Sequence, residues 1–236
     1  MQPVREWLKQ ARSVAVLTGA GVPAESGIPT FRGNNGLWKQ HRAEDLATPG
    51  AFGRDPKLVW EWYDWRRGLI AEAKPNPGHY ALAALEERTP KFTLITQNVD
   101  GLHESAGSRN VLGLHGSIWI LRCVSCGHEM EDRRTPLPEI PPRCECGALL
   151  RPGVVWFGEA LASEVWRPAE IAARTADVFL VIGTSAAVYP AAGLAQIAKS
   201  SGARVVEINI AETGLSQQID EFLEGPSGKL LPSLIA

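Results

Sequence analysis

The sequence lacks the features that would place the chain in a membrane or on a nucleic acid. No apolar run approaches the roughly 20 residues that span a bilayer, and the formal net charge of −2 gives no overall field that favours nucleic acid or an anionic membrane. Residues 1–7 lack the basic-then-apolar pattern of a secretory signal. Internal repeats and low-complexity stretches are also lacking. We therefore expect a soluble cytoplasmic protein that binds neither nucleic acid directly nor a membrane; the sequence does not identify its oligomeric state.

Cysteine is scarce, and the four cysteines all lie between residues 123 and 146. They form a C-x-x-C pair, Cys123 and Cys126, and a tighter C-x-C pair, Cys144 and Cys146. Two disulfides are possible by count, but clustered cysteines in a cytosolic chain favour a metal site. Four thiolates satisfy tetrahedral zinc and leave no open position, so we expect one structural Zn²⁺. A zinc finger that reads DNA would also need a recognition helix and a basic face, and neither is evident.

Apolar runs alternate with helical patterns along the rest of the chain. Strands are expected at residues 13–17, 92–96, 110–114, 176–182 and 204–209, and helices at 4–12, 58–73, 78–88 and 191–199. Near-continuous apolar strands separated by helices indicate an α/β fold with a doubly wound, Rossmann-like parallel sheet.

A chain of 236 residues can bury one large core and carry a smaller module. We expect the small domain to consist of a helical insertion, 38–75, and a zinc-binding module, 119–152. The Rossmann-like large domain would then comprise residues 1–37, 76–118 and 153–236.

A glycine-rich turn follows the first predicted strand. Gly19, Gly21 and Ala24 match the G-x-G-x-x-A pattern of dinucleotide-binding turns, in which glycines let the backbone turn and approach a ligand. Pro23 suits the first turn of a helix whose free N–H groups would face a pyrophosphate. Such turns are common, so this one alone supports nucleotide binding and a plain turn about equally. The acidic pair at 44–45 ends no clear strand, which argues against an ordinary dehydrogenase.

Polar residues stand where further strands end, which is the place where open α/β sheets bind ligands. His115 follows the third predicted strand, and its imidazole could be a general base or a satisfied structural histidine. Gln97, Asn98 and Asp100 follow the second strand, where they could also cap a helix. Residues 183–185 could be a bare turn. The remaining histidines lack such a context, and we expect them to be structural or on the surface.

Taken together, these motifs closely resemble those of the sirtuins, the NAD-dependent protein-lysine deacylases. The resemblance covers roughly residues 12–232 and rests on the segment 18–33, the Q-N-x-D motif at 97–100 and the L-H-G-S motif at 114–117. It implies NAD as co-substrate and His115 as the catalytic base. Pro23 departs from the family, which usually has serine there, so backbone N–H groups would have to meet the phosphate.

The resemblance also implies the binding residues. The cofactor-binding set would be Gly19, Ala20, Gly21, Thr30, Phe31, Arg32, Trp38, Gln97, Asn98, Asp100, Gly183, Thr184, Ser185, Asn209, Ala211 and Ser227. A substrate peptide would pair with the backbone of Val154, Val155, Trp156 and Phe157, although by pattern alone this segment could be only a core strand. The four cysteines match the zinc module of the family.

Tyr63 and Arg66 indicate a subtype. They lie three residues apart on a predicted helix and so share one face, and a guanidinium with a phenol suits a carboxylate. By pattern alone, a surface helix with an aromatic packing stripe is the simpler interpretation. The run Tyr63-Asp64-Trp65-Arg66, however, resembles the Y-x-x-R motif of class III sirtuins, which remove succinyl, malonyl and glutaryl groups.

The resemblance therefore implies an enzyme that removes acetyl, and also succinyl or malonyl, groups from lysines of protein substrates. The other products would be nicotinamide and O-acyl-ADP-ribose. Two alternatives would use the same pocket: ADP-ribosyl transfer from NAD to a protein, and a non-catalytic NAD sensor. The complete set of Asn98, Asp100 and His115 argues against the sensor.

Overall fold

The computed structural model describes residues 1–30, 37–38 and 41–235. The chain divides into two compact units. Unit 1 consists of Met1–Gly27, Lys74–Leu114 and Ala162–Ala236, and unit 2 consists of Ile28–Ala73 and His115–Leu161. Across the described part of the chain, no helix combines the length and the apolar character needed to cross a membrane.

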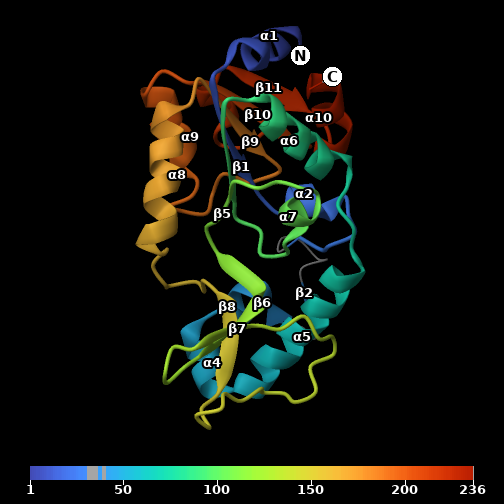
Figure 1. Cartoon of the computed structure of the whole chain (residues 1–236), viewed down its shortest axis with the longest axis vertical. Coiled ribbons are helices and arrows are strands. Elements are labelled where there is room, and N and C mark those ends of the chain that lie inside the picture. The colour runs from blue at the N-terminus through green and yellow to red at the C-terminus, as the bar shows by residue number, and fades with distance from the viewer. Residues whose placement is uncertain (31–36, 39–40, 236) are drawn as a thin grey trace. The chain divides into compact units, whose positions relative to one another are not determined.

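Unit 1 is built on a six-stranded parallel sheet (Figure 1). In spatial order the strands are β11 (Glu221–Glu224), β10 (Arg204–Asn209), β9 (Val178–Ile182), β1 (Ser13–Thr18), β4 (Lys91–Thr96) and β5 (Val111–Gly113). The chain runs outward from β1 to β5, returns to β9 on the other side of β1, and runs outward again to β11. This is the strand order of a Rossmann fold, with its topological switch point between β1 and β9. The predicted doubly wound parallel sheet is confirmed.

Helices cover both faces of this sheet (Figure 1). One face is covered by α6 (Pro77–Arg88) and α10 (Ser227–Ile235), with α1 (Gln2–Gln10) beside α10. The other face is covered by α8 (Ser163–Thr175) and α9 (Gly193–Ser200). Three short elements lie in the connections: α2 (Gly21–Ala24), α7 (Leu102–Ser105) and the 3-10 turn Ser216–Gln218.

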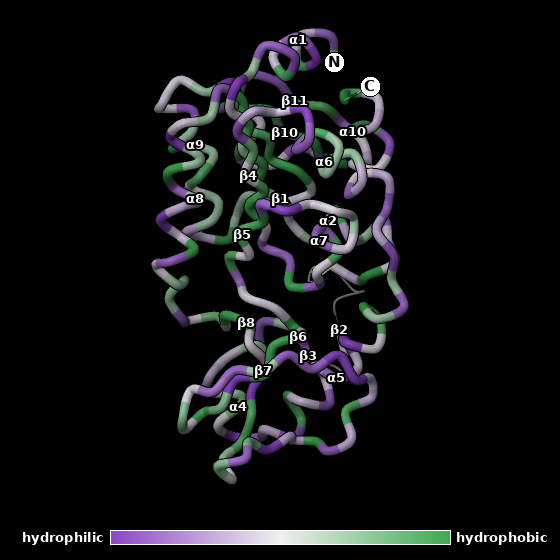
Figure 2. The backbone as a smooth tube through the Cα atoms, in the orientation of Figure 1, coloured by the Kyte–Doolittle hydropathy of each residue, from purple (hydrophilic) through white to green (hydrophobic). Residues whose placement is uncertain are grey.

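The core of unit 1 explains why its strands are apolar throughout. Val14 and Val16 of β1 pack in one cluster with residues of α6 and α10. Their neighbours Ala15 and Leu17 point to the opposite face and are equally buried. Figure 2 shows hydrophobic residues concentrated in the sheet between the two helix pairs. Because both faces are covered, the strands show no alternation of apolar and polar residues.

Unit 2 combines a small antiparallel sheet with helices. The sheet has the order β7 (Glu129–Glu131), β6 (Gly116–Cys123) and β8 (Leu150–Val154). The helices are α3 (Ala43–Leu46), α4 (Pro49–Arg54) and α5 (Pro56–Glu72), and β2 (Leu37–Trp38) pairs with β3 (His41–Arg42). Pro56 begins α5, and the Asp55 side chain accepts a hydrogen bond from Leu58 N at 2.9 Å. The buried Trp60 joins α5 to the sheet by donating to Leu150 O at 2.7 Å.

The structure divides the chain at other residues than the sequence suggested. Strands β6 and β8 pair as far as Gly116 and Val154, so the division falls at His115 and after Leu161. Residues 154–159, expected to return to the large domain, therefore lie in unit 2. The core-strand interpretation of this segment is wrong beyond Val154, where the strand ends and a turn follows.

Among the described strands of unit 1 and its helices of eight or more residues, three elements have no counterpart among the sequence predictions: α8, β11 and α10. Pro168 lies inside α8 and Pro232 inside α10. A proline in a helical pattern normally ends the helix, so the sequence signal for both helices is weak. The edge strand β11 is only half-buried and carries two glutamates, which hides its strand pattern.

Candidate active site and metal centre

The glycine-rich turn and the loop after β9 pack against each other at the switch point of unit 1. Gly19 N donates to Ile182 O at 3.0 Å, and Gly21 N donates to Gly183 O at 2.8 Å. A Cβ at Gly19 would lie 2.7 Å from Thr184 Cβ, and one at Gly21 would lie 2.8 Å from Gly183 Cα. The glycines are thus required by loop-to-loop packing, a reason that the sequence alone did not suggest. Ligands of open α/β sheets bind at this position.

The helix that begins at this turn is a single turn long. Ala20 has helical backbone angles and immediately precedes α2. Pro23 is buried inside α2, so this position holds a packed apolar residue. The side chain at position 23 therefore offers no donor to a phosphate. The N–H groups of Gly19, Gly21, Val22 and Ala24 already donate to carbonyl oxygens of the chain, which leaves the Ala20 N–H as the donor that the described part of this loop supplies.

The predicted cofactor-binding residues between positions 30 and 38 lie in unit 2, and two of them fall outside the residues that the structure describes. Thr30 is half-buried. Phe31 and Arg32 lie outside the described residues. Trp38, in β2, is half-buried and lies near Trp65 of α5, with ring centroids 6.3 Å apart.

The side chains that follow β4 form hydrogen bonds with the glycine-rich turn after β1 and with the loop after β9. Gln97 Nε2 donates to Thr184 Oγ1 at 3.0 Å, and Asn98 Nδ2 donates to Gly19 O at 3.1 Å. Asn98 N donates to Thr96 Oγ1 at 3.0 Å, which fixes the backbone as well. These bonds gather two amide side chains at the carboxyl ends of β1, β4 and β9. The positions of the strand ends predicted polar residues at this edge, and the resemblance to the sirtuins implied that they share one site.

Asp100 caps a helix, as the simpler interpretation of its motif allowed. Its Oδ1 accepts a hydrogen bond from Leu102 N at 2.8 Å, at the start of α7. Gly101 between them has φ of +80°, a left-handed conformation that favours glycine. Asp100 is buried, and the hydrogen bond from Leu102 N fixes the direction of its carboxylate.

Three further predicted residues follow β9 and β10. Asn209 ends β10, and its Nδ2 donates to Thr184 O at 2.8 Å, which ties the two strand ends together. Ser185 is half-buried and Ala211 is exposed. Together with the Gly183 loop, these residues extend the same edge of the sheet.

Ser227 has a structural partner. It is the first residue of α10 and is buried, and its Oγ donates to Glu25 Oε1 at 2.7 Å. The same carboxylate accepts from Gly228 N at 3.0 Å. This hydroxyl is therefore already committed to joining α10 to the end of the glycine-rich loop.

His115 stands in the turn between β5 and β6 and is half-buried. Its carbonyl oxygen accepts a hydrogen bond from Val155 N at 2.9 Å, so the turn is joined to the end of β8. Gly116 has φ of +76°, and a Cβ there would lie 2.2 Å from Gly153 O. Only glycine fits beside His115, which explains the His-Gly pair of the motif.

Tyr63 and Arg66 lie on the buried side of α5, and the surface-helix interpretation is wrong for them. Trp156 Nε1 donates to Tyr63 Oη at 2.9 Å, and the Arg66 guanidinium lies 5.4 Å from the Trp62 ring centroid. Burial raises the pKa of the Tyr63 phenol well above its usual range, against the opposing effects of the Trp156 hydrogen bond and the Arg66 charge. The phenol is therefore neutral at all physiological pH values.

An arginine–glutamate pair around Trp156 was not singled out from the sequence. Arg151 donates to both carboxylate oxygens of Glu159, at 2.6 and 2.9 Å, and its guanidinium lies 3.4 Å from the Trp156 ring centroid. Glu159 Oε2 also accepts from Trp156 N at 2.8 Å. Burial raises the pKa of the Glu159 carboxyl, but the Arg151 hydrogen bonds outweigh this and hold it below its usual value. The sequence signal that could have indicated this pair is an arginine and a glutamate on either side of Trp156 within one short segment.

Two histidines form a buried stack in unit 1. The rings of His79 and His103 lie 4.8 Å apart, and His103 Nε2 is 3.0 Å from Thr18 Oγ1. Thr18 Oγ1 donates to Thr96 Oγ1 at 2.8 Å, so His103 Nε2 is the donor to Thr18. Burial lowers the pKa of His79 to about 4 and that of His103 to about 3. Both are structural, as expected, and both are neutral at pH 7.

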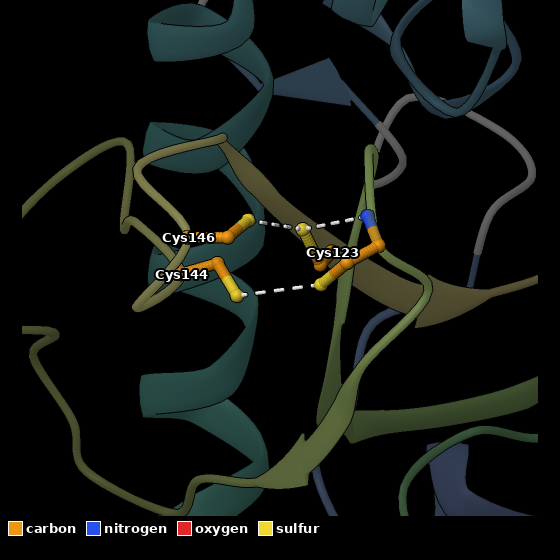
Figure 3. A group of neighbouring side chains, drawn as sticks. Cys123, Cys144 and Cys146 are labelled. Atoms are coloured by element: carbon orange, nitrogen blue, oxygen red, sulfur yellow. Dashed lines mark hydrogen bonds between the residues drawn. The ribbon is translucent and has the colours of Figure 1, made fainter.

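The four cysteines meet at the end of the small sheet in unit 2. Their sulfur atoms all lie within 4.8 Å of one another, and Figure 3 shows Cys144 and Cys146 facing Cys123. The sulfur pairs Cys123–Cys146 and Cys126–Cys144 are 3.5 and 3.8 Å apart. Four sulfurs at ~2.3 Å from a tetrahedral zinc lie roughly 3.8 Å from one another, so the set fits this metal.

The first cysteine pair shows how the backbone prepares a thiolate. The N–H groups of Cys126 and Ser125 both approach Cys123 Sγ at 3.4 Å. These two hydrogen bonds lower the pKa of the Cys123 thiol to about 6. All four cysteines are free, so the disulfide alternative is wrong.

The fold and these residues define a class: a Rossmann-type protein with a dinucleotide-binding switch point and a four-cysteine zinc module. A model of the Sir2 family matches residues 19–190. An NAD-dependent protein deacylase of Aquifex aeolicus is 59% identical over 209 residues, 88% of this chain and 87% of the relative. NAD-dependent protein deacylase 2 of Pyrobaculum aerophilum is 54% identical over 233 residues, 98% of this chain and 93% of the relative.

Solved structures of Sir2 proteins have the same fold as this chain. A crystal structure of a Sir2 homologue in complex with NAD has a TM-score of 0.95 at 48% identity, covering 100% of this chain and 92% of that one. A Sir2 structure with a p53 peptide and NAD⁺ has a TM-score of 0.88 at 30% identity, covering 100% of this chain and 97% of that one. The chain belongs to the Sir2 family.

Proposed function

We propose that this chain is an NAD-dependent protein-lysine deacylase that consumes NAD as co-substrate. The observation that carries the proposal is the group of bonds by which Gln97 and Asn98 join the Gly19 loop to Thr184 at the switch point. Family membership supports it, because relatives at 50% identity and above are NAD-dependent protein deacylases.

Unit 1 supplies the residues proposed to bind NAD. The N–H groups of Gly19, Gly21, Val22 and Ala24 donate within the chain, and Pro23 has none. Among the described residues 19–24, the Ala20 N–H is therefore the backbone donor that would meet the pyrophosphate. Asn98 and Asp100 would bind the nicotinamide ribose end, and Asn209 the adenosine ribose. Ser227 is the weakest member of this set because its hydroxyl already binds Glu25.

His115 is the proposed general base. A neutral imidazole can accept a proton from a ribose hydroxyl near neutral pH, and that oxygen then attacks the acyl carbon. Before this step the acyl oxygen displaces nicotinamide from the ribose carbon that carried it. The amine of lysine then leaves, and one water molecule adds to the acyl carbon, so the products are free lysine, nicotinamide and O-acyl-ADP-ribose. The tight turn at Gly116 and the hydrogen bond from Val155 N to His115 O fix the backbone at His115, which supports this role.

Substrate protein is proposed to bind along residues 154–157 through its main chain. The N–H groups of Val155, Trp156 and Phe157 already donate within the chain, to His115 O, Glu159 Oε2 and Ala47 O respectively. A substrate peptide would therefore use carbonyl oxygens of this segment as acceptors. Such pairing is indifferent to the peptide's side chains and so tolerates many target sequences.

We propose that acidic acyl groups are the preferred substrates. Arg66 and Tyr63 are both less than 10% exposed, and together they offer a buried cation and a neutral phenol. A guanidinium binds a carboxylate through charge-assisted hydrogen bonds, and a neutral phenol can donate one more. The terminal carboxylate of a succinyl, malonyl or glutaryl group would satisfy both residues.

The four cysteines would hold one zinc ion, which supplies a structural cross-link between the end of β6 and the loop that precedes β8. We also propose a reducing, cytoplasmic location for the protein. Free thiols at these distances persist where the thiol pool is kept reduced.

The test is a comparison of two forms of one peptide, acetylated and succinylated at the same lysine, with and without NAD. Removal of both groups only with NAD, and faster removal of succinyl, is the expected result. Removal of acetyl alone would refute the preference for acidic acyl groups but would still support an NAD-dependent deacylase. Labelling of protein by ADP-ribose without acyl removal would refute the deacylase and favour the transferase.

A further inference from the structure

The hydroxyl of Tyr63 has one hydrogen-bond partner among the described residues, and that partner can only donate. The indole N–H of Trp156 points at Tyr63 Oη at 2.9 Å, and indole has no acceptor atom. The phenolic hydrogen of Tyr63 must therefore point elsewhere. Within the described part of the chain no acceptor receives it, although the side chain is only 4% exposed. Buried donors without an acceptor are rare in native proteins, so this one indicates a ligand.

Trp156 is held rigidly while it makes this bond. The Arg151 guanidinium lies over its ring at 3.4 Å from the centroid, and the Phe52 ring lies beside it at 5.3 Å. Glu159 binds both Arg151 and the Trp156 backbone N–H. Because these contacts fix both the ring and the backbone of Trp156, its N–H has a fixed direction. The Tyr63 hydroxyl oxygen thus accepts a hydrogen bond from a donor whose position is fixed.

We propose that Trp156 is a specificity-determining positioning residue: it turns the Tyr63 hydroxyl into a directed donor for an acceptor atom at the far end of the acyl group. This inference rests on the proposed removal of acidic acyl groups. Arg66 supplies the charge for a terminal carboxylate, and Tyr63 supplies the directed bond. An acetyl group has no distal acceptor, so the arrangement favours succinyl, malonyl and glutaryl groups over acetyl.

The experiment measures kcat/KM for succinyl-lysine and acetyl-lysine forms of one peptide and takes their ratio within each enzyme preparation. A preparation that is partly unfolded lowers both values equally and leaves the ratio unchanged. W156F removes the indole N–H and keeps an aromatic ring. If W156F fails to fold, β-(3-benzothienyl)alanine at position 156 replaces the N–H with sulfur and keeps both rings. W60F is the matched control, because Trp60 donates its indole N–H to Leu150 O and not to Tyr63.

The expected result is a fall of about tenfold in the succinyl-to-acetyl ratio for W156F, the size of one hydrogen bond to a charged group. W60F should keep the wild-type ratio. Because Trp156 acts through Tyr63, W156F added to Y63F should change the ratio by less than about twofold. Two results would overturn the inference about Trp156 and leave the acidic-acyl proposal standing. One is an unchanged ratio in W156F, and the other is a tenfold fall in the ratio when W156F is added to Y63F. A wild-type enzyme with no preference for succinyl overturns the acidic-acyl proposal and this inference with it.

Discussion

The buried histidine stack predicts that unit 1 loses stability in mild acid. His79 and His103 are 0% and 1% exposed, and burial lowers their pKa values to about 4 and about 3. In the unfolded chain a histidine has a pKa of about 6.5. Between these values the unfolded state binds protons that the folded state does not. The free energy of unfolding therefore falls as the pH drops below 6.5.

The expected loss in the free energy of unfolding follows from these pKa values. At pH 5 almost every unfolded histidine is protonated, so each of the two costs the fold about 2 kcal/mol relative to pH 8, and the pair about 4 kcal/mol. The perturbation is the double variant H79Q/H103Q, because glutamine keeps polar atoms near the ring nitrogens and does not titrate. Urea unfolding followed by far-UV circular dichroism, at pH 8 and at pH 5, gives the loss for each protein.

The double variant should lose about 4 kcal/mol less between pH 8 and pH 5 than the wild type does. The comparison uses this difference and not the absolute stabilities, because the variant also loses the His103–Thr18 bond. H41Q is the matched control, since His41 is only partly buried and lies in unit 2, and it should keep the wild-type loss. Equal losses in the double variant and the wild type would refute the claim that the stack is held neutral.

Three other predictions concern the proposed sites. H115A should lower turnover at least a hundredfold, the usual size of general-base catalysis, while NAD still raises the melting temperature; full turnover in H115A would contradict the base role. Metal-free protein, prepared with a chelator, should unfold unit 2 at lower temperature, because structural zinc contributes folding free energy in small modules. An unchanged melting profile would count against the zinc site. R66M should reduce succinyl-lysine activity about tenfold more than acetyl-lysine activity, since it removes a charged partner; equal losses would mean that Arg66 does not read the acyl group.

Most of the Rossmann sheet was predictable from the sequence because its central strands are buried on both faces. These strands read as largely apolar runs, whereas the edge strand β11 is half-buried and does not. The polar residues that follow the central strands mark the ligand edge. The strand ends place Gln97, Asn98 and Thr184 at that edge, but only the resemblance to the sirtuins implied that they belong to one site; their hydrogen bonds to each other and to Gly19 are seen in the structure. The catalytic and binding roles of these residues stay predictions, which the experiments above test.

The remaining features depend on partners that are distant in the sequence. Tyr63 and Trp156 are 93 positions apart, and nothing local to either residue indicates their hydrogen bond. Ser227 finds Glu25 across 202 positions, which commits a hydroxyl that the motif assigns to a ligand. The division at His115 depends on how far β6 pairs with β8, including a register shift after Gly116. Local patterns do not determine such pairings.

The central claim is that acyl removal and NAD cleavage are one reaction at one site. The most direct measurement is the product balance: deacylated peptide, nicotinamide and O-acyl-ADP-ribose counted by mass spectrometry in a single incubation with succinylated peptide and NAD. We predict that the three products form in equal amounts and that H115A forms none of the acyl-ADP-ribose. Nicotinamide released without an equal amount of deacylated peptide, or ADP-ribose attached to protein, would contradict the account.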